Sequence, residues 1–173
     1  LAREKAEKSK NSNPKPQKGS GIVITADTTV TVDNEIIGKP GNAAEAVEML
    51  KKLRGRTHQV CTAITLINLE TGESIHELCS SDVPMRNYSD EEMDAYVASG
   101  DPLDKAGGYA IQHNGFHPVE NFSHCYASVM GLPLCHLTRA LGKFKVELSV
   151  DVPLKCQQFN NYRCPVYGEI LSK

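Results

Sequence analysis

The chain has 173 residues, 40% of them hydrophobic and 23% charged, with a formal net charge of −2. This length suits one domain with its own core, and the charge argues against general nucleic-acid binding. The sequence holds no run of 18 apolar residues that would span a membrane. Its charged start lacks the apolar stretch of a secretory signal. We therefore expect a cytoplasmic protein without membrane contact, whose six cysteines are free thiols.

Charge and composition divide the chain into three segments. Residues 1–20 carry six Lys/Arg against two Glu, and their second half is rich in Asn, Pro, Lys, Gly and Ser. We interpret this segment as the end of a helix followed by a flexible loop. Residues 21–152 are predicted to form the main domain, and residues 153–173 a C-terminal tail.

The stretch IVITADTTVTVDNEIIGKP, residues 22–40, organises the main domain. Its β-branched start predicts a buried strand over 22–24 that delivers Asp27 at its end, and a short strand follows over 30–32. A turn then returns the chain to Lys39, which places a carboxylate and a lysine on one rim. An acid that handles water or a metal and a cation that holds phosphate suit phosphate-ester chemistry. Alternatively, Asp27 caps the next turn.

Residues 43–53 have the apolar stripe of an amphipathic helix. Asn42 and Glu45 predict a capping box at its start, and Gly55 predicts its end. Two alternating segments, 59–68 and 74–80, then predict an antiparallel hairpin. His58 leads into this hairpin, and we expect it to be a rim residue rather than a metal ligand.

Ser89 and Glu92 predict a second capping box, which explains the acidic cluster at 90–92 as a helix start rather than a metal site. The loop that follows carries Asp104 and Lys105 into two glycines and a predicted apolar strand over 109–112. Paired glycines let backbone N–H groups approach an anion closely. Together with the acid and lysine of residues 22–40, this loop supplies two lysines and two carboxylates, which suit a metal–triphosphate.

The remaining sequence is less informative. Residues 119–130 and 134–141 are predicted to be helical, and residues 145–152 favour a strand. Histidines and cysteines of the last 50 residues offer zinc ligands, but no CxxC pair is present, so free thiols are the preferred interpretation.

Several of these motifs, in this order, resemble the Maf family, the septum-formation-inhibitor-like nucleoside triphosphate pyrophosphatases. They are ADTTV at 26–30, Gly38-Lys39-Pro40, LRGRTH at 53–58, SGDPLDKAGGYAIQ at 99–112 and VMGLPL at 129–134. The resemblance implies an α/β, Maf/ITPase-like fold: an elongated mixed twisted sheet with flanking helices and a cleft between two lobes. It further implies a cytoplasmic enzyme, commonly a homodimer. The enzyme would cleave a nucleoside triphosphate to the monophosphate and pyrophosphate with Mg²⁺ or another divalent cation.

Carried over by position, the resemblance makes Asp27 the water-activating base or metal-side carboxylate. It makes Asp27 and Asp104 candidate metal ligands. It assigns substrate binding to Lys5, Thr28, Lys39, Arg56, Thr57, Asp104, Lys105 and Gln112. Thr28 resembles the subgroup that acts on dTTP and UTP, whereas the subgroup that prefers 7-methylguanosine triphosphate has glutamine there.

One family feature is absent from the sequence. The family opens with a strand and a phosphate-holding Ser-Pro-Arg-Arg loop, and this motif occurs nowhere in the chain. The alternatives are that the chain is a fragment, that its gene start is placed too late, or that it is a catalytically inactive relative that binds nucleotides or a partner.

Overall fold

The computed structural model describes residues 3–5, 8 and 21–173, and the predicted helix end and loop of residues 1–20 lie largely outside them. Its centre is a four-stranded sheet of order β2-β1-β3-β4 in which every pairing is antiparallel. The strands are β1 (Ile22–Val32), β2 (Glu35–Ile37), β3 (Thr57–Asn68) and β4 (Ser74–Pro84).

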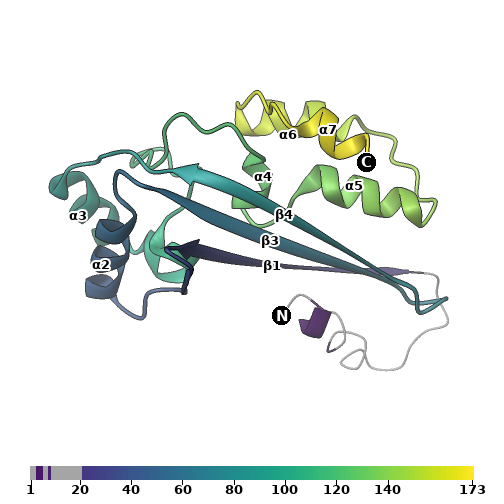
Figure 1. The fold of residues 1–173 in the computed structure, drawn as a ribbon, viewed down its shortest axis with the longest axis horizontal. Helices are drawn as coiled ribbons and strands as arrows, with labels where there is room; N and C mark the ends of the chain where they lie inside the picture. The colour runs from purple at the N-terminus through teal and green to yellow at the C-terminus, as the bar shows by residue number, and fades with distance from the viewer. Residues whose placement is uncertain (1–2, 6–7, 9–20) are drawn as a thin grey trace.

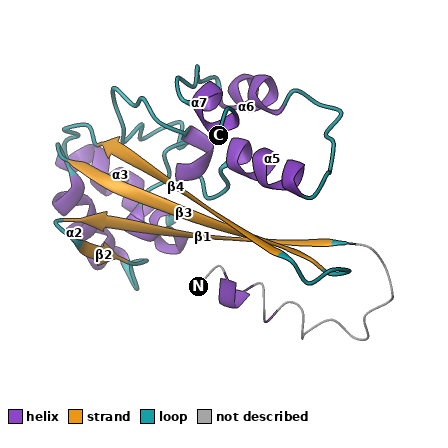
Figure 2. Ribbon diagram, turned by 45° about the vertical axis from the view of Figure 1, so that its right-hand side comes forward, coloured by secondary structure: helices purple, strands orange, loops and turns teal. Residues whose placement is uncertain are grey.

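Helices flank this sheet in two groups (Figure 1). One group, at the left in the figure, comprises α2 (Ala43–Leu53), α3 (Asp90–Ala98) and the short 3-10 turns η1 (Asp101–Asp104) and η2 (Ala106–Gly108). The other comprises α4 (Tyr126–Val129), α5 (Leu134–Lys143), α6 (Val152–Asn160) and α7 (Tyr167–Leu171). The second group lies above the long strands in Figures 1 and 2, and the predicted α/β class, a sheet flanked by helices, is confirmed.

The β1–β3 ladder corrects one prediction at the heart of the chain. Strand β1 runs without a break, pairing with β3 from Ile22 opposite Asn68 to Thr31 opposite Gln59. Asp27 therefore lies in the middle of a strand, opposite Ala63, rather than at a strand end. The β-branched threonines that follow Asp27 favour extended backbone, and the ladder continues through them.

One of the two predicted capping boxes is complete. At α2, the Asn42 side chain accepts a hydrogen bond from the Glu45 N–H as predicted, but the Glu45 carboxylate accepts from the Gly41 N–H rather than from the Asn42 N–H, so only half of that box forms. At α3, Ser89 and Glu92 satisfy each other's backbone N–H groups. The left-handed φ of 65° at Gly55 follows the end of α2. The β3–β4 hairpin is also confirmed.

Three local predictions are wrong. Residues 109–112 form no strand, because the left-handed turns at Gly107 and Gly108 lead into an irregular segment whose apolar side chains enter the core singly. Residues 119–125 are not helical, and only α4 forms there. Residues 145–151 contain turns and bends instead of a strand, and helix α6 begins at Val152.

The main core lies where β1 and β3 meet α2, α3 and the 109–116 segment. Its buried members include Val30, Leu50, Leu53, Val60, Val83, Tyr88, Met93, Tyr96 and Tyr109. His58 is also buried there, with 3% of its surface exposed, so the prediction of a rim residue is wrong. It shares the inward face of β3 with Val60 and Ile64, because alternate residues of a strand point the same way. Among the described residues, no helix has the length and apolar character needed to cross a bilayer.

A half-buried ion pair holds the α5–α7 group against the sheet. The Glu77 side chain on β4, only 8% exposed, accepts hydrogen bonds from Arg139 on α5 and, at 3.0 Å, from Lys143. Arg139 also donates to the Ile170 carbonyl of α7 at 2.8 Å. Although burial raises the pKa of Glu77, these two cations outweigh it and hold that pKa below its usual value.

Replacing Arg139 by methionine should remove most of this connection. We expect the free energy of unfolding in urea to fall by about 3 kcal/mol, because a buried carboxylate loses its guanidinium partner. Lys143→Met is the matched control and should cost less than about 1 kcal/mol, because Lys143 is more than half exposed. Equal losses in the two variants would contradict this account of the contact.

The burial of His58 predicts a pH dependence of stability. Burial lowers the pKa of its imidazole from 6.5 to about 4. Between these values the unfolded chain binds a proton that the folded chain does not, so stability falls as the pH falls through this window. Urea unfolding at pH 7 and pH 5 should show a loss of about 2 kcal/mol from this residue. In His58→Gln the loss should be smaller by that amount, and an unchanged loss would contradict the assignment.

Candidate active site

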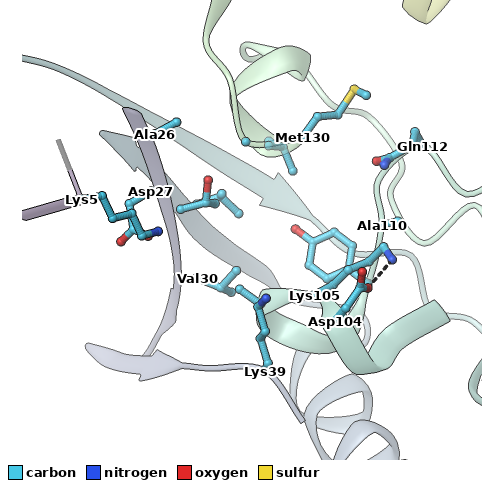
Figure 3. A pocket seen from close by; sticks show the side chains of 16 residues that line it. Lys5, Ala26, Asp27, Val30, Lys39, Asp104, Lys105, Ala110, Gln112 and Met130 are labelled. Carbon is cyan, nitrogen blue, oxygen red and sulfur yellow. Dashed lines mark hydrogen bonds and ion pairs between the residues drawn. The ribbon is translucent and has the colours of Figure 1, made fainter. Parts of the chain in front are cut away.

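A cavity of about 320 Å³ opens beside the middle of β1. Strand β2 pairs with β1 only from Val30 to Val32. The edge of β1 that faces β2 therefore has no described strand partner over residues 22–29. The cavity lies between this edge, the turn after β2, the η1–η2 loop and the end of α4. The polar and charged side chains that line it are Lys5, Asp27, Thr28, Lys39, Asp104, Lys105 and Gln112. Figure 3 shows Lys5 and Asp27 on one side and Asp104 and Lys105 on the other, with Lys39 below them.

The structure thus brings together seven of the nine predicted site residues. The other two, Arg56 and Thr57, do not line this cavity. Arg56 forms an exposed ion pair with Asp33 at 2.7 Å, and Thr57 is exposed at the start of β3. The cavity gives no support to their assignment as nucleotide-binding residues, which stays a prediction.

Asp27 provides the carboxylate at the β1 side of the cavity. Its side chain is 17% exposed and forms an ion pair with Lys5. The β1–β3 ladder pairs Asp27 and the residues before and after it with β3, which fixes the backbone of Asp27. A carboxylate that is held rigidly and still reached by solvent is a suitable general base for a bound water.

Thr28 presents a hydrogen-bond acceptor to the cavity. Its Oγ1 lies 2.8 Å from Thr62 Oγ1, and Thr62 donates its own hydroxyl hydrogen to the Ser128 carbonyl at 2.7 Å. The Thr28 hydroxyl must therefore donate to Thr62, and its oxygen lone pairs are left to accept from a donor in the cavity. Gly131, after α4, lies beside this hydroxyl: a Cβ there would be in ordinary van der Waals contact with Thr28 Oγ1, at 3.5 Å.

The two lysine-bearing loops are joined by their backbones. The Gly107 N–H donates to the Gly38 carbonyl at 2.9 Å, which sets the η2 turn beside the turn that carries Lys39. Gly107 has a φ of 75°, and a Cβ there would lie 3.2 Å from Val30 Cγ1. Only glycine meets both requirements without strain. The close approach of Gly107 is thus directed at the sheet. The N–H groups of Gly107 and Gly108 both donate to backbone carbonyls, so the prediction that they approach an anion is wrong.

Lys105 is held in place by two carboxylates. Its Nζ donates to Asp104 Oδ1 at 2.7 Å and to Asp101 Oδ1 at 3.0 Å. Burial lowers the pKa of Lys105, but these hydrogen bonds outweigh burial and raise it overall, so the ammonium stays charged. The same bond to Lys105 lowers the pKa of Asp104.

The sequence reasoning missed three residues that build this site. Asp101 anchors Lys105, and Tyr109 lines the cavity. His58 lies behind Tyr109, with its Nε2 2.7 Å from the phenol oxygen. The alternation of His58 with Val60 and Ile64 along β3 is the signal that indicates its inward direction. The residues of the cavity wall from Val129 to Gly131 come from the VMGLPL motif.

Comparison with known proteins places the chain in a family. A family model described as Maf-like protein matches residues 1–144. A dTTP/UTP pyrophosphatase of Dehalococcoides mccartyi is 43% identical over 124 residues, which are 72% of this chain and 55% of that protein. Proteins of the same name from Dictyoglomus turgidum and Bacillus mycoides are 42% and 44% identical over 75% and 74% of the chain, and over 67% and 66% of their own lengths.

The chain spans between about half and two thirds of the length of these relatives. The matched residues 1–144 contain the whole cavity, from Lys5 to Gly131, and all four strands. The chain therefore belongs to the Maf-like protein family.

Proposed function

We propose that this chain carries the active site of a nucleoside triphosphate pyrophosphatase that acts on dTTP- or UTP-type nucleotides, modified forms included, and releases the monophosphate and pyrophosphate. The observation that carries this proposal is the meeting of Asp27, Lys39 and Lys105 at one cavity, although they lie far apart in the sequence. The names of the relatives supply the substrate class.

The charges of the cavity suit a polyphosphate. Lys39 is exposed and, among the described residues, forms no ion pair, so its ammonium is available to a phosphate oxygen. Lys5 and Lys105 are each paired with aspartate and contribute less net positive charge. Binding a triphosphate against these aspartates requires further positive charge, which favours a cation bound with the substrate.

A divalent cation such as Mg²⁺ fits the donors present. Among the described residues no group of three or more His, Cys, Asp or Glu side chains is placed to hold a metal. Mg²⁺ is usually held by one or two carboxylates together with substrate phosphates, and Asp27 and Asp104 both line the cavity. When bound, the ion would neutralise phosphate charge as a Lewis acid.

We assign phosphate binding, proton transfer and recognition of the base to different residues of the chain. Lys39 and Lys105 bind and orient the phosphate chain, and Asp27 accepts a proton from the water that attacks the α-phosphorus. Thr28 offers its acceptor to a donor on the nucleotide, and the imide N–H of thymine or uracil is such a donor. We further propose that the enzyme is a cytoplasmic homodimer, as the family resemblance implies.

Loss of the Asp27 carboxylate should abolish turnover. In Asp27→Asn we expect pyrophosphate release from dTTP or UTP with Mg²⁺ to fall at least 100-fold, because the amide cannot accept the proton of water. Asp94→Asn, an exposed change on α3, is the matched control and should keep full activity. Activity that survives in Asp27→Asn would refute the base assignment. Triphosphate binding without any turnover in the unmodified chain would favour an inactive binding protein instead.

Lys39 should act mainly on substrate affinity. Lys39→Met removes one charge-assisted contact to phosphate, and we expect the KM for dTTP to rise about 10-fold. Lys155→Met, on the exposed side of α6, should leave KM unchanged. Steady-state assays over a range of nucleotide concentrations measure the KM of both variants. An unchanged KM in Lys39→Met would contradict the assignment of this lysine to phosphate binding.

A further inference from the structure

At the cavity wall lies a buried pair of rings that the proposed chemistry does not use. His58 Nε2 and the Tyr109 hydroxyl oxygen are 2.7 Å apart, and the two rings meet edge to face with centroids 5.3 Å apart. Both residues are at most 5% exposed. Tyr109 lines the cavity, whereas His58 does not. The other ring nitrogen of His58 has no hydrogen-bond partner among the described residues.

This hydrogen bond connects residues 105–112, which we call the Lys105 loop, to strand β3. The loop belongs to no strand, and three other bonds hold its backbone to distant elements. The Gly107 N–H donates to Gly38, the Ala110 N–H donates to the Tyr96 hydroxyl at 3.1 Å, and the Ile111 carbonyl accepts from the Tyr126 hydroxyl at 3.1 Å. Those three bonds tie the loop to the turn after β2, to α3 and to α4. The bond to His58 ties it to β3, the strand that pairs with β1 and fixes Asp27.

The imidazole is suited to structural use and not to proton transfer with substrate. Its ring is enclosed by core residues, and burial keeps its pKa near 4, so it is neutral at physiological pH. A neutral imidazole forms this bond to the phenol without adding a positive charge behind the lysines of the cavity. The bond lies within a close-packed core, where a lost contact shifts its neighbours.

We propose that His58 is a positioning residue of the active site: its hydrogen bond to Tyr109 sets where the Lys105 loop stands relative to Asp27. The inference rests on the proposed function, since it concerns how the lysine and the carboxylate meet one triphosphate. A misplaced catalytic group costs rate even when the substrate still binds. Loss of the bond therefore lowers kcat more than it raises KM.

A matched pair of tyrosine variants tests this inference. Tyr109→Phe removes the hydroxyl and keeps the ring at the cavity wall. Tyr88→Phe removes an equally short bond, 2.7 Å to the Leu50 carbonyl, from the same core but away from the cavity. Both should lower Tm by a few degrees. In the pyrophosphate-release assay, Tyr109→Phe should lower kcat about 10-fold with less than a threefold change in KM, and Tyr88→Phe should change neither.

Variants of His58 test the same hydrogen bond from its other partner. His58→Leu should reproduce the kcat loss of Tyr109→Phe, and the double variant should be no slower than either single variant, because one bond is lost in each. His58→Gln places an amide near the position of Nε2 and should restore kcat to within threefold of the unmodified chain. Equal kcat in Tyr109→Phe and Tyr88→Phe would overturn the inference, as would His58→Gln as slow as His58→Leu.

The same assay distinguishes a failure of the proposed function from a failure of this inference. If the unmodified chain releases no pyrophosphate from any triphosphate, the proposed function fails and the inference fails with it. If the unmodified chain is active but the Tyr109 and His58 variants match the Tyr88 control, the inference alone is wrong.

Discussion

The antiparallel ladder between β1 and β3 is the constraint on which the site depends. It fixes ten consecutive residues of β1, including Asp27 and Thr28, against a strand whose side chains are largely buried. The short pairing with β2 leaves the edge of β1 beside Asp27 without a described strand partner, and the cavity opens there. One strand thus provides a rigid support for the acid and an open side for a ligand.

The lysines reach this cavity through backbone geometry rather than through regular secondary structure. The Gly107–Gly38 hydrogen bond places two loops side by side, and the absence of a side chain at Gly107 allows the contact with Val30. Asp101, Asp104 and Lys105 then form a compact charged cluster whose protonation states support one another. The positive charge of the cavity is thereby limited, which is the physical reason to expect a cation to accompany the substrate.

Local signals in the sequence predicted the elements that local physics determines. The N-cap at Asn42, the capping box at Ser89 and the β3–β4 hairpin need only neighbouring residues, and all are present. The meeting of Asp27, Lys39 and Lys105 followed from motif order, and the cavity contains all three. The prediction of a strand at 109–112 was wrong. Tyr109 and Ile111 are apolar at alternate positions because tertiary packing buries them after two glycines with left-handed backbone, not because they belong to a sheet. The bond between His58 and Tyr109 joins residues 51 positions apart and has no local signature.

A crystal structure of the chain with Mg²⁺ and α,β-imido-dUTP, which resists cleavage, is the most direct measurement of the central claim. The account predicts phosphate oxygens in hydrogen-bond contact with Lys39 and Lys105, and the α-phosphorus within reach of a water held by Asp27. A nucleotide bound at another face, or one whose phosphates point away from Asp27, would contradict it.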